Sequence, residues 1–152
     1  GSTYVFSPKA HEALARVLRD LDYSHIGVHD WYVYALARSI GLTWAIGEEP
    51  TLEYRQHGGN VQGANSGSGA RDARMAKLRN GFYRKQFILM SRTAAQVGTF
   101  DERRARQLKA IVRELEGQGL ASRLRFALRW TQIRRDRMEG LKLAAARVLG
   151  VW

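Results

Sequence analysis

A glycine-rich segment divides this chain into two parts. Between positions 58 and 69 the sequence holds five glycines, with asparagine and serine among them. These residue types favour turns and loops over helices and strands. Glycine loses much conformational entropy when it is fixed in a helix or strand, and the side chains of Asn and Ser form hydrogen bonds with nearby backbone. We therefore predict that this segment lacks regular structure and separates residues 1–66 from a C-terminal region, residues 67–152.

The two parts differ strongly in charge. Residues 1–70 contain 5 basic and 7 acidic side chains, whereas residues 71–152 contain 20 basic and 7 acidic ones. The net charge of +11 therefore comes from the second part. Such a charge distribution attracts an anionic partner, which could be nucleic acid, an anionic bilayer surface or a phosphorylated carrier.

Helical periodicity predicts two helices in the first part. Ser7 and Pro8 are typical of a helix start, and the apolar residues after them recur at helical spacing to about position 21. A second helix is expected to start at Asp30 and to end near position 41. Between residues 42 and 56, apolar residues around a break at Pro50 predict two short strands or extended segments.

The sequence after residue 70 predicts helices throughout. One long helix should run to about Val97, and residues 99–102 fit a capping box that opens the next helix. Further helices should follow Gly119 and lead towards Trp152. We thus expect an α+β chain that is mostly α-helical, with one or two short strand pairs followed by a bundle of basic amphipathic helices. Such helices are typical both of proteins on anionic lipid and of the solvated face of a bundle.

The composition excludes some classes of protein. The chain has no cysteine, so it can hold no disulfide and no thiolate-bound metal. It has no apolar run near the roughly 18 residues of a membrane-spanning helix, and its start does not resemble a signal peptide. We expect a cytoplasmic protein, either soluble or peripheral at the inner face of the cytoplasmic membrane.

Asp30 is the strongest candidate for a catalytic residue. A carboxylate can act as the general base that takes a proton from an attacking hydroxyl. An aspartate at a helix start is also a common N-cap, and the helix dipole favours its ionised form in either role. The sequence leaves both roles open.

Three other residues have a possible chemical role beside a simpler one. His57 could bind a divalent cation or a diphosphate, because the adjacent glycines allow close approach, but a lone loop histidine is more often solvated. Arg55 could hold a diphosphate or pair with a nearby glutamate. Trp31 could stack on a sugar ring or fill the core.

Two motifs together resemble the paired signatures of family-2 glycosyltransferases, particularly the bacterial rhamnosyltransferase-like branch. They are His29-Asp30-Trp31, in which histidine replaces a frequent glutamate, and Tyr54-Arg55-Gln56-His57-Gly58-Gly59-Asn60. The resemblance implies that residues 1–66 are the acceptor-side part of a GT-A catalytic domain and that residues 67–152 are a C-terminal helical region. It implies the following roles: Asp30 as catalytic base, Arg55 and His57 at the donor diphosphate, His57 also as metal ligand, and Trp31 and Thr3 at the acceptor.

The resemblance also implies a reaction. An inverting enzyme would transfer a sugar from a nucleotide-sugar donor to a hydroxyl of a polysaccharide or lipid-linked acceptor, assisted by Mg²⁺ or Mn²⁺. The nucleotide-binding half of such enzymes and its Asp-x-Asp metal motif are expected to be absent. We therefore expect a C-terminal fragment that is inactive alone and requires no cofactor itself.

Two alternatives come from other functional classes. One is a basic helical nucleic-acid-binding module, and the other is a membrane-surface adaptor without catalysis. Nucleic acid is the less favoured partner, because no known DNA- or RNA-binding motif accompanies the charge. An anionic membrane surface suits the basic helices better.

Overall fold

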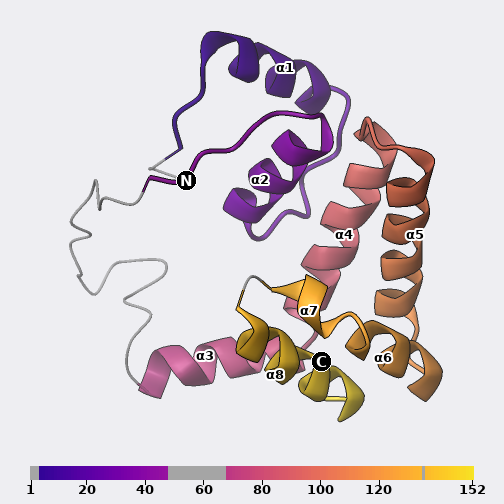
Figure 1. Ribbon diagram of the computed structural model, residues 1–152. Coiled ribbons are helices and arrows are strands. Elements are labelled where there is room, and N and C mark those ends of the chain that lie inside the picture. Colours follow the sequence, from indigo (N-terminus) through magenta and orange to yellow (C-terminus); the bar gives the residue numbers. More distant parts are fainter. Residues whose placement is uncertain (1–3, 48–67, 135) are drawn as a thin grey trace.

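The structure is a computed structural model that describes residues 4–47, 68–134 and 136–152, and in these residues it has helices and no strand (Figure 1). In chain order the helices are α1 (Pro8–Leu18), α2 (His29–Ser39), α3 (Ser68–Arg79), α4 (Phe82–Val97), α5 (Glu102–Glu116), α6 (Leu120–Ala127), α7 (Trp130–Ile133) and α8 (Arg137–Val148). The expected predominance of helix is confirmed.

The strands expected between residues 42 and 56 are not seen in the part that the structure describes. Residues 42–47 have no regular structure, and residues 48–56 lie outside the described residues. The ring of Trp44 explains why an apolar pattern here does not indicate a strand. It packs edge-on against the rings of Tyr4 and Tyr34, at centroid distances of 4.8 and 5.1 Å, so its segment is held by side chains rather than by a ladder of backbone bonds.

The first helix begins as the sequence predicts. The Ser7 hydroxyl accepts the backbone N–H of Ala10 at 3.2 Å, and Pro8 occupies the first helical turn. Leu14 is the buried residue of α1, and it belongs to a core that also contains Leu36 of α2 and Met90 of α4. This core fixes α1 and α2 against the long α4.

A buried glutamine joins the loop before α2 to α4. Gln86 on α4 accepts the backbone N–H of Gly27 at 2.8 Å and donates to the carbonyl of His25 at 3.2 Å. Both polar atoms of its side chain are therefore satisfied, as a 6% exposed amide requires. Because this loop leads directly into α2, Gln86 determines where α2 begins.

The single long helix expected before Val97 is wrong, because α3 and α4 are separate helices. Gly81 between them has a φ of +75°, a left-handed conformation that favours glycine and interrupts an α-helix. The side chain of Asn80 then accepts the backbone N–H of Phe82 at 2.9 Å and so satisfies a free amide at the start of α4.

The capping box expected at residues 99–102 is also wrong. The cap of α5 is Asp101, whose carboxylate accepts the backbone N–H of Arg104 at 2.8 Å. Thr99 instead donates its backbone N–H to the carbonyl of Ser39 at 3.0 Å. That bond joins the end of α2 to the segment before α5, so a tertiary contact replaces the expected local one.

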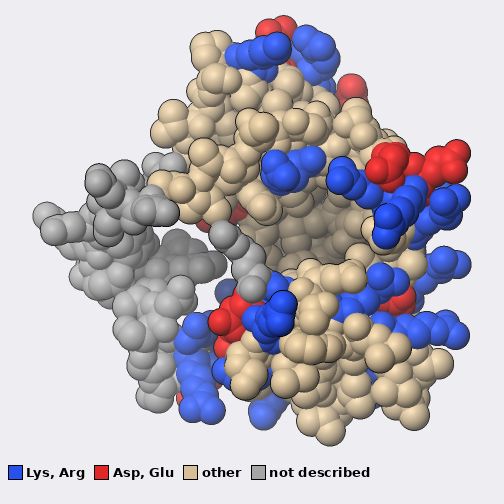
Figure 2. Space-filling view, viewed as in Figure 1, with Lys and Arg blue, Asp and Glu red and all other residues tan. Residues whose placement is uncertain are grey.

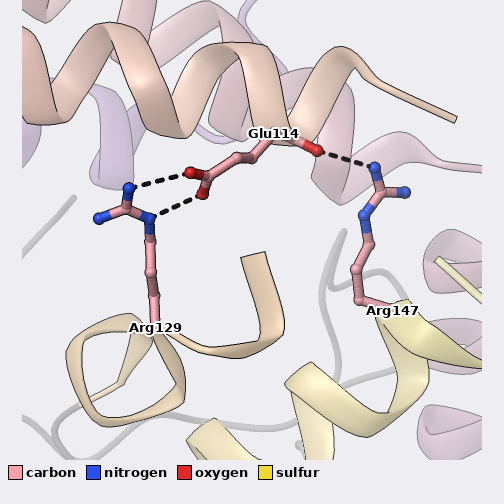
Figure 3. Close-up of polar contacts among 3 residues, drawn as sticks. All are labelled: Glu114, Arg129 and Arg147. Atoms are coloured by element: carbon pink, nitrogen blue, oxygen red, sulfur yellow. Dashed lines mark hydrogen bonds and ion pairs between the residues drawn. The ribbon is translucent and has the colours of Figure 1, made fainter. Parts of the chain in front are cut away.

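Arg147 of α8 is completely buried and closes the end of α5 (Figure 3). Its guanidinium donates to the carbonyls of Glu114, Leu115 and Gly117 at 3.1, 3.1 and 2.6 Å, and to the carbonyl of Trp152 at 2.8 Å. The last carbonyls of a helix have no partner within the helix, and a cation there also complements the helix dipole. One side chain thus connects α5, α8 and Trp152.

An ion pair lies beside this buried arginine. Arg129 donates twice to the carboxylate of Glu114, at 2.7 and 2.9 Å, and both side chains are mostly buried (Figure 3). This two-bond geometry raises the pKa of Arg129. Glu114 therefore contacts Arg129 through its side chain and Arg147 through its backbone. These contacts hold α5 against α8 and against the residues that follow α6.

We predict that Arg147→Met lowers the free energy of unfolding by about 3 kcal/mol, because the substitution leaves several buried carbonyls without a donor while keeping much of the side-chain volume. Urea unfolding followed by circular dichroism measures the change. Arg103→Met on the exposed side of α5 is the matched control and should change the free energy by no more than about 0.5 kcal/mol. Equal effects of the two substitutions would show that the hydrogen bonds of Arg147 add little.

Candidate functional site

Asp30 lies in the first turn of α2 but is not its N-cap. The helix begins at His29, and the cap position belongs to Val28, whose side chain makes no capping bond. The N-cap alternative for Asp30 is therefore wrong, because Asp30 lies two positions after the cap. One carboxylate oxygen lies 2.7 Å from Nε2 of His29, and the side chain is 39% exposed.

Tyr4 ties the chain before α1 to Asp30. Its hydroxyl donates to the backbone carbonyl of Asp30 at 3.1 Å. Burial raises the pKa of Tyr4, and the negative charge of Asp30 and the neighbouring Tyr34 raise it further. A phenol and a carboxylate thus share one small region although 26 positions separate them in the sequence.

An open groove of about 490 Å³ is lined by Tyr4 and Trp31, which are a hydrogen-bond partner and the sequence neighbour of Asp30, although Asp30 itself is not among the lining residues. Figure 2 shows a hollow near the centre of the view, between α2 and α7. We call the groove the aromatic groove. Its lining includes Tyr4 and four further aromatic residues, Trp31, Tyr34, Phe87 and Phe100, together with Arg134. Most of the lining is apolar, and Arg134 supplies a positive charge. The groove can therefore take a ligand with flat apolar faces.

Trp31 has both of the environments that the sequence left open. Its ring stacks on Phe87 at a centroid distance of 5.4 Å and an angle of 11°, and on Tyr83 at 5.8 Å and 30°. These contacts commit much of the ring to the core between α2 and α4. Trp31 also lines the aromatic groove, so its role at an acceptor stays a prediction.

The other expected site residues are not part of the described structure. Thr3, Arg55 and His57 lie outside residues 4–47, 68–134 and 136–152. Their assignments to the acceptor, the donor diphosphate and the metal stay predictions. Within the described ranges, no three His, Asp or Glu side chains come together to hold a metal ion.

The letters of the Asp-x-Asp metal motif do occur, at Asp20-Leu21-Asp22, which corrects the expectation that they are absent. Their context differs from that of a metal motif, because they follow α1 rather than a strand. The carboxylate of Asp22 accepts the backbone N–H of Ser24 at 2.9 Å, and hydrogen bonds from Ser24 lower the pKa of Asp22. A local turn therefore explains this aspartate.

Two tyrosines that line the groove, Tyr4 and Tyr34, were not expected from the sequence to belong to a site. Tyr34 follows Asp30 by one helical turn, so the two share a helix face, and its 43% exposed ring is consistent with this spacing. Tyr4 has no comparable signal, since only the fold brings it to α2. Its ring contacts Phe6 and Trp44, which hold it in place.

Comparison with known proteins gives one distant relative. Over 127 residues the chain is 28% identical to the dTDP-rhamnosyl transferase RfbG of Shigella flexneri. The match covers 84% of this chain but only 40% of that protein, so the chain spans well under half the length of the curated relative. No protein-family model matches the chain, and no solved structure gives a significant match. The resemblance to rhamnosyltransferases is confirmed as a distant and partial one.

We predict that Asp30→Asn brings the pKa of Tyr4 down towards its ordinary value of 10.0, because the substitution removes a nearby negative charge while burial stays. Since the folded state raises this pKa, the resulting stability is complete below pH 10 and is lost as the pH rises through the folded pKa. NMR titration of the Tyr4 ring carbon measures the shift. Asp20→Asn is the control, and an unchanged Tyr4 in Asp30→Asn would contradict the proximity of the two groups.

Proposed function

We propose that this chain is the acceptor-side part and C-terminal helical region of an inverting, rhamnosyltransferase-like glycosyltransferase. The position of Asp30 next to Tyr4 and Trp31, both of which line the aromatic groove, carries the proposal, because a glycosyl transfer needs a carboxylate near a place where a sugar can bind. The distant similarity to a dTDP-rhamnosyl transferase supports the same reaction class. By analogy with that protein's name, we propose dTDP-rhamnose as the donor.

Asp30 would act as the general base of the transfer. Asp30 lies in the first turn of α2, which places its carboxylate near the start of the helix. It would take the proton of an acceptor hydroxyl as that oxygen bonds to the anomeric carbon, and the nucleoside diphosphate would leave from the opposite face of the sugar. Because the nucleophile and the leaving group lie on opposite faces, the anomeric configuration inverts.

The aromatic groove would bind the acceptor. Sugar rings have C–H faces that pack well on aromatic rings, and the 43% exposed ring of Tyr34 offers such a surface next to Asp30. Trp31 would border the acceptor with the edge that its stacking on Phe87 leaves accessible. Thr3 is proposed for the same region. We propose a polysaccharide or a lipid-linked glycan as the acceptor.

The donor diphosphate would meet Arg55 and His57. The forked guanidinium of an arginine matches phosphate oxygens, and imidazole is a usable ligand for a divalent cation. Bound Mg²⁺ or Mn²⁺ would neutralise charge on the leaving diphosphate. We assign no step to the cation, because the described residues offer no complete set of ligands for it.

We predict that the 152-residue chain alone does not bind dTDP tightly. Calorimetry with dTDP and Mn²⁺ should show no submicromolar affinity, because the expected nucleotide-binding half has no counterpart in this sequence. Submicromolar binding would contradict the assignment of this chain to the acceptor side.

In a longer protein that joins this chain to a nucleotide-binding half, we predict that Asp30→Asn lowers turnover by at least about 1,000-fold and leaves donor affinity nearly unchanged, because the base acts on the acceptor hydroxyl. Initial rates with dTDP-rhamnose measure the first effect, and calorimetry measures the second. Asp20→Asn is the matched control and should keep full turnover. His57→Ala should instead weaken donor binding. An Asp30→Asn enzyme with most of its turnover would exclude Asp30 as the base.

A further inference from the structure

Six large apolar side chains on or next to α6 and α8 are exposed to solvent. We call them the α6–α8 apolar face, and their exposed fractions run from 47% for Leu124 and Leu141 to 81% for Leu128. The members are Leu120, Leu124, Leu128, Met138, Leu141 and Leu149. Single exposed apolar residues are ordinary, but a group of this size on two helices that pack against each other is a candidate binding surface.

The α6 part of this face follows helical spacing. Leu120, Leu124 and Leu128 are four positions apart, so they line up along one side of the helix. Phe126 points the other way and is 4% exposed, in the core with Leu115 and Trp152. The helix therefore packs against the core through Phe126, and the three leucines on its other side stay exposed to solvent.

Helices α6 and α8 pack against each other, and Arg123 joins α6 to the chain just after α8. A Cβ atom on Gly150 would lie only 2.5 Å from a terminal nitrogen of Arg123. Leu149, which is 77% exposed, is next to that glycine. Figure 2 shows mostly uncharged surface over α6 and the end of α8, at the lower right of the view.

Exposed cations lie beside the leucines and outside the core. Arg125 is on α6 and Arg137 opens α8, and neither forms an ion pair with any residue that the structure describes. Residues 71–152 as a whole carry 20 basic and 7 acidic side chains. An apolar stripe flanked by arginines matches the boundary between acyl chains and anionic headgroups in a bilayer.

We propose that the α6–α8 apolar face docks on the surface of an anionic bilayer, with its leucines among the acyl chains and Arg125 and Arg137 at the headgroup phosphates. A second copy of this chain fits less well, because face-to-face pairing would bring arginine against arginine. Duplex DNA would use the cations but leave the leucines in water. The helices would lie along the surface of the bilayer. Within the described residues, no helix is both long and apolar enough to cross one.

Co-sedimentation of the 152-residue chain with vesicles tests the proposal. We expect binding to phosphatidylglycerol-containing vesicles that weakens with salt, and much weaker binding to pure phosphatidylcholine. Leu124→Ser combined with Leu128→Ser should weaken binding by at least about tenfold, because the leucines no longer enter the acyl region. Ile46→Ser, which removes another 65% exposed apolar side chain, is the matched control and should bind as the wild type does.

A second pair of variants, which have the same net charge as each other, tests whether the position of the cation matters. Arg125→Glu should weaken binding to anionic vesicles several-fold more than Arg19→Glu at the end of α1, because only Arg125 lies next to the inserted leucines. Circular dichroism of each variant checks that it is folded. Equal effects of the two substitutions would overturn the proposal, because they would reduce the interaction to overall charge.

Two further measurements distinguish a bilayer from the other possible partners of this face, a second copy of the chain and duplex DNA. The first is sedimentation velocity without lipid. The proposal expects a monomer, and a dimer that the double leucine substitution dissociates would assign the face to a second copy instead. Duplex DNA binding that is tighter than vesicle binding and insensitive to the leucine substitutions would assign the charge to nucleic acid. None of these measurements uses donor or acceptor, so their outcome does not depend on the proposed sugar transfer.

Discussion

The arrangement of the C-terminal helices depends on one buried cation. Arg147 has no exposed surface, and burial together with the nearby Arg84 and Arg123 lowers its pKa. An arginine nevertheless stays charged at neutral pH, so its burial is favourable only because carbonyl oxygens surround it. Those carbonyls belong to the last turn of α5 and to Trp152. The end of one helix and the cation of another therefore satisfy each other, and the Leu115–Phe126–Trp152 core forms around them.

The aromatic groove depends on this arrangement at one end and on Gln86 at the other. Arg134 and Ile133 reach the groove from the C-terminal helices, whereas Trp31 and Tyr34 reach it from α2, whose start Gln86 fixes. Helix α4 contributes Phe87 to the groove and contacts both α2 and α5. The groove is thus a junction between the two parts of the chain, and residues from both would have to stay in place for a ligand to bind there.

Local signals in the sequence predicted the helices but not how they meet. The Ser7-Pro8 start and the start of a helix after Gly119 follow from backbone chemistry alone, and both are found where expected. The break at Gly81 was missed because apolar spacing continues across it, so periodicity alone indicates one helix. The spacing of residues 99–102 matches a capping box, but Thr99 instead contacts Ser39. These two residues are 60 positions apart in the sequence, and no short pattern can show such a contact.

Some residues of the candidate site could likewise be predicted from the sequence, whereas others could not. Asp30 and Trp31 could be found from their motif and their place at a helix start. Tyr4 could not, because its hydroxyl reaches Asp30 only through the fold. Buried charges were the hardest feature to foresee: Arg147 is one of 25 basic residues, and its sequence neighbourhood looks like a solvated basic helix.

The bond from Tyr4 to Asp30 has a practical consequence for where the chain can be cut. Tyr4 lies upstream of α1, in a segment with no regular structure, and domain-boundary rules would treat such a segment as expendable. Yet its hydroxyl and its ring contacts with Phe6 and Trp44 hold the entrance of α2. A shortened protein that begins at Pro8 would contain all the helices of the described residues but would lose the hydrogen bond from Tyr4 to Asp30.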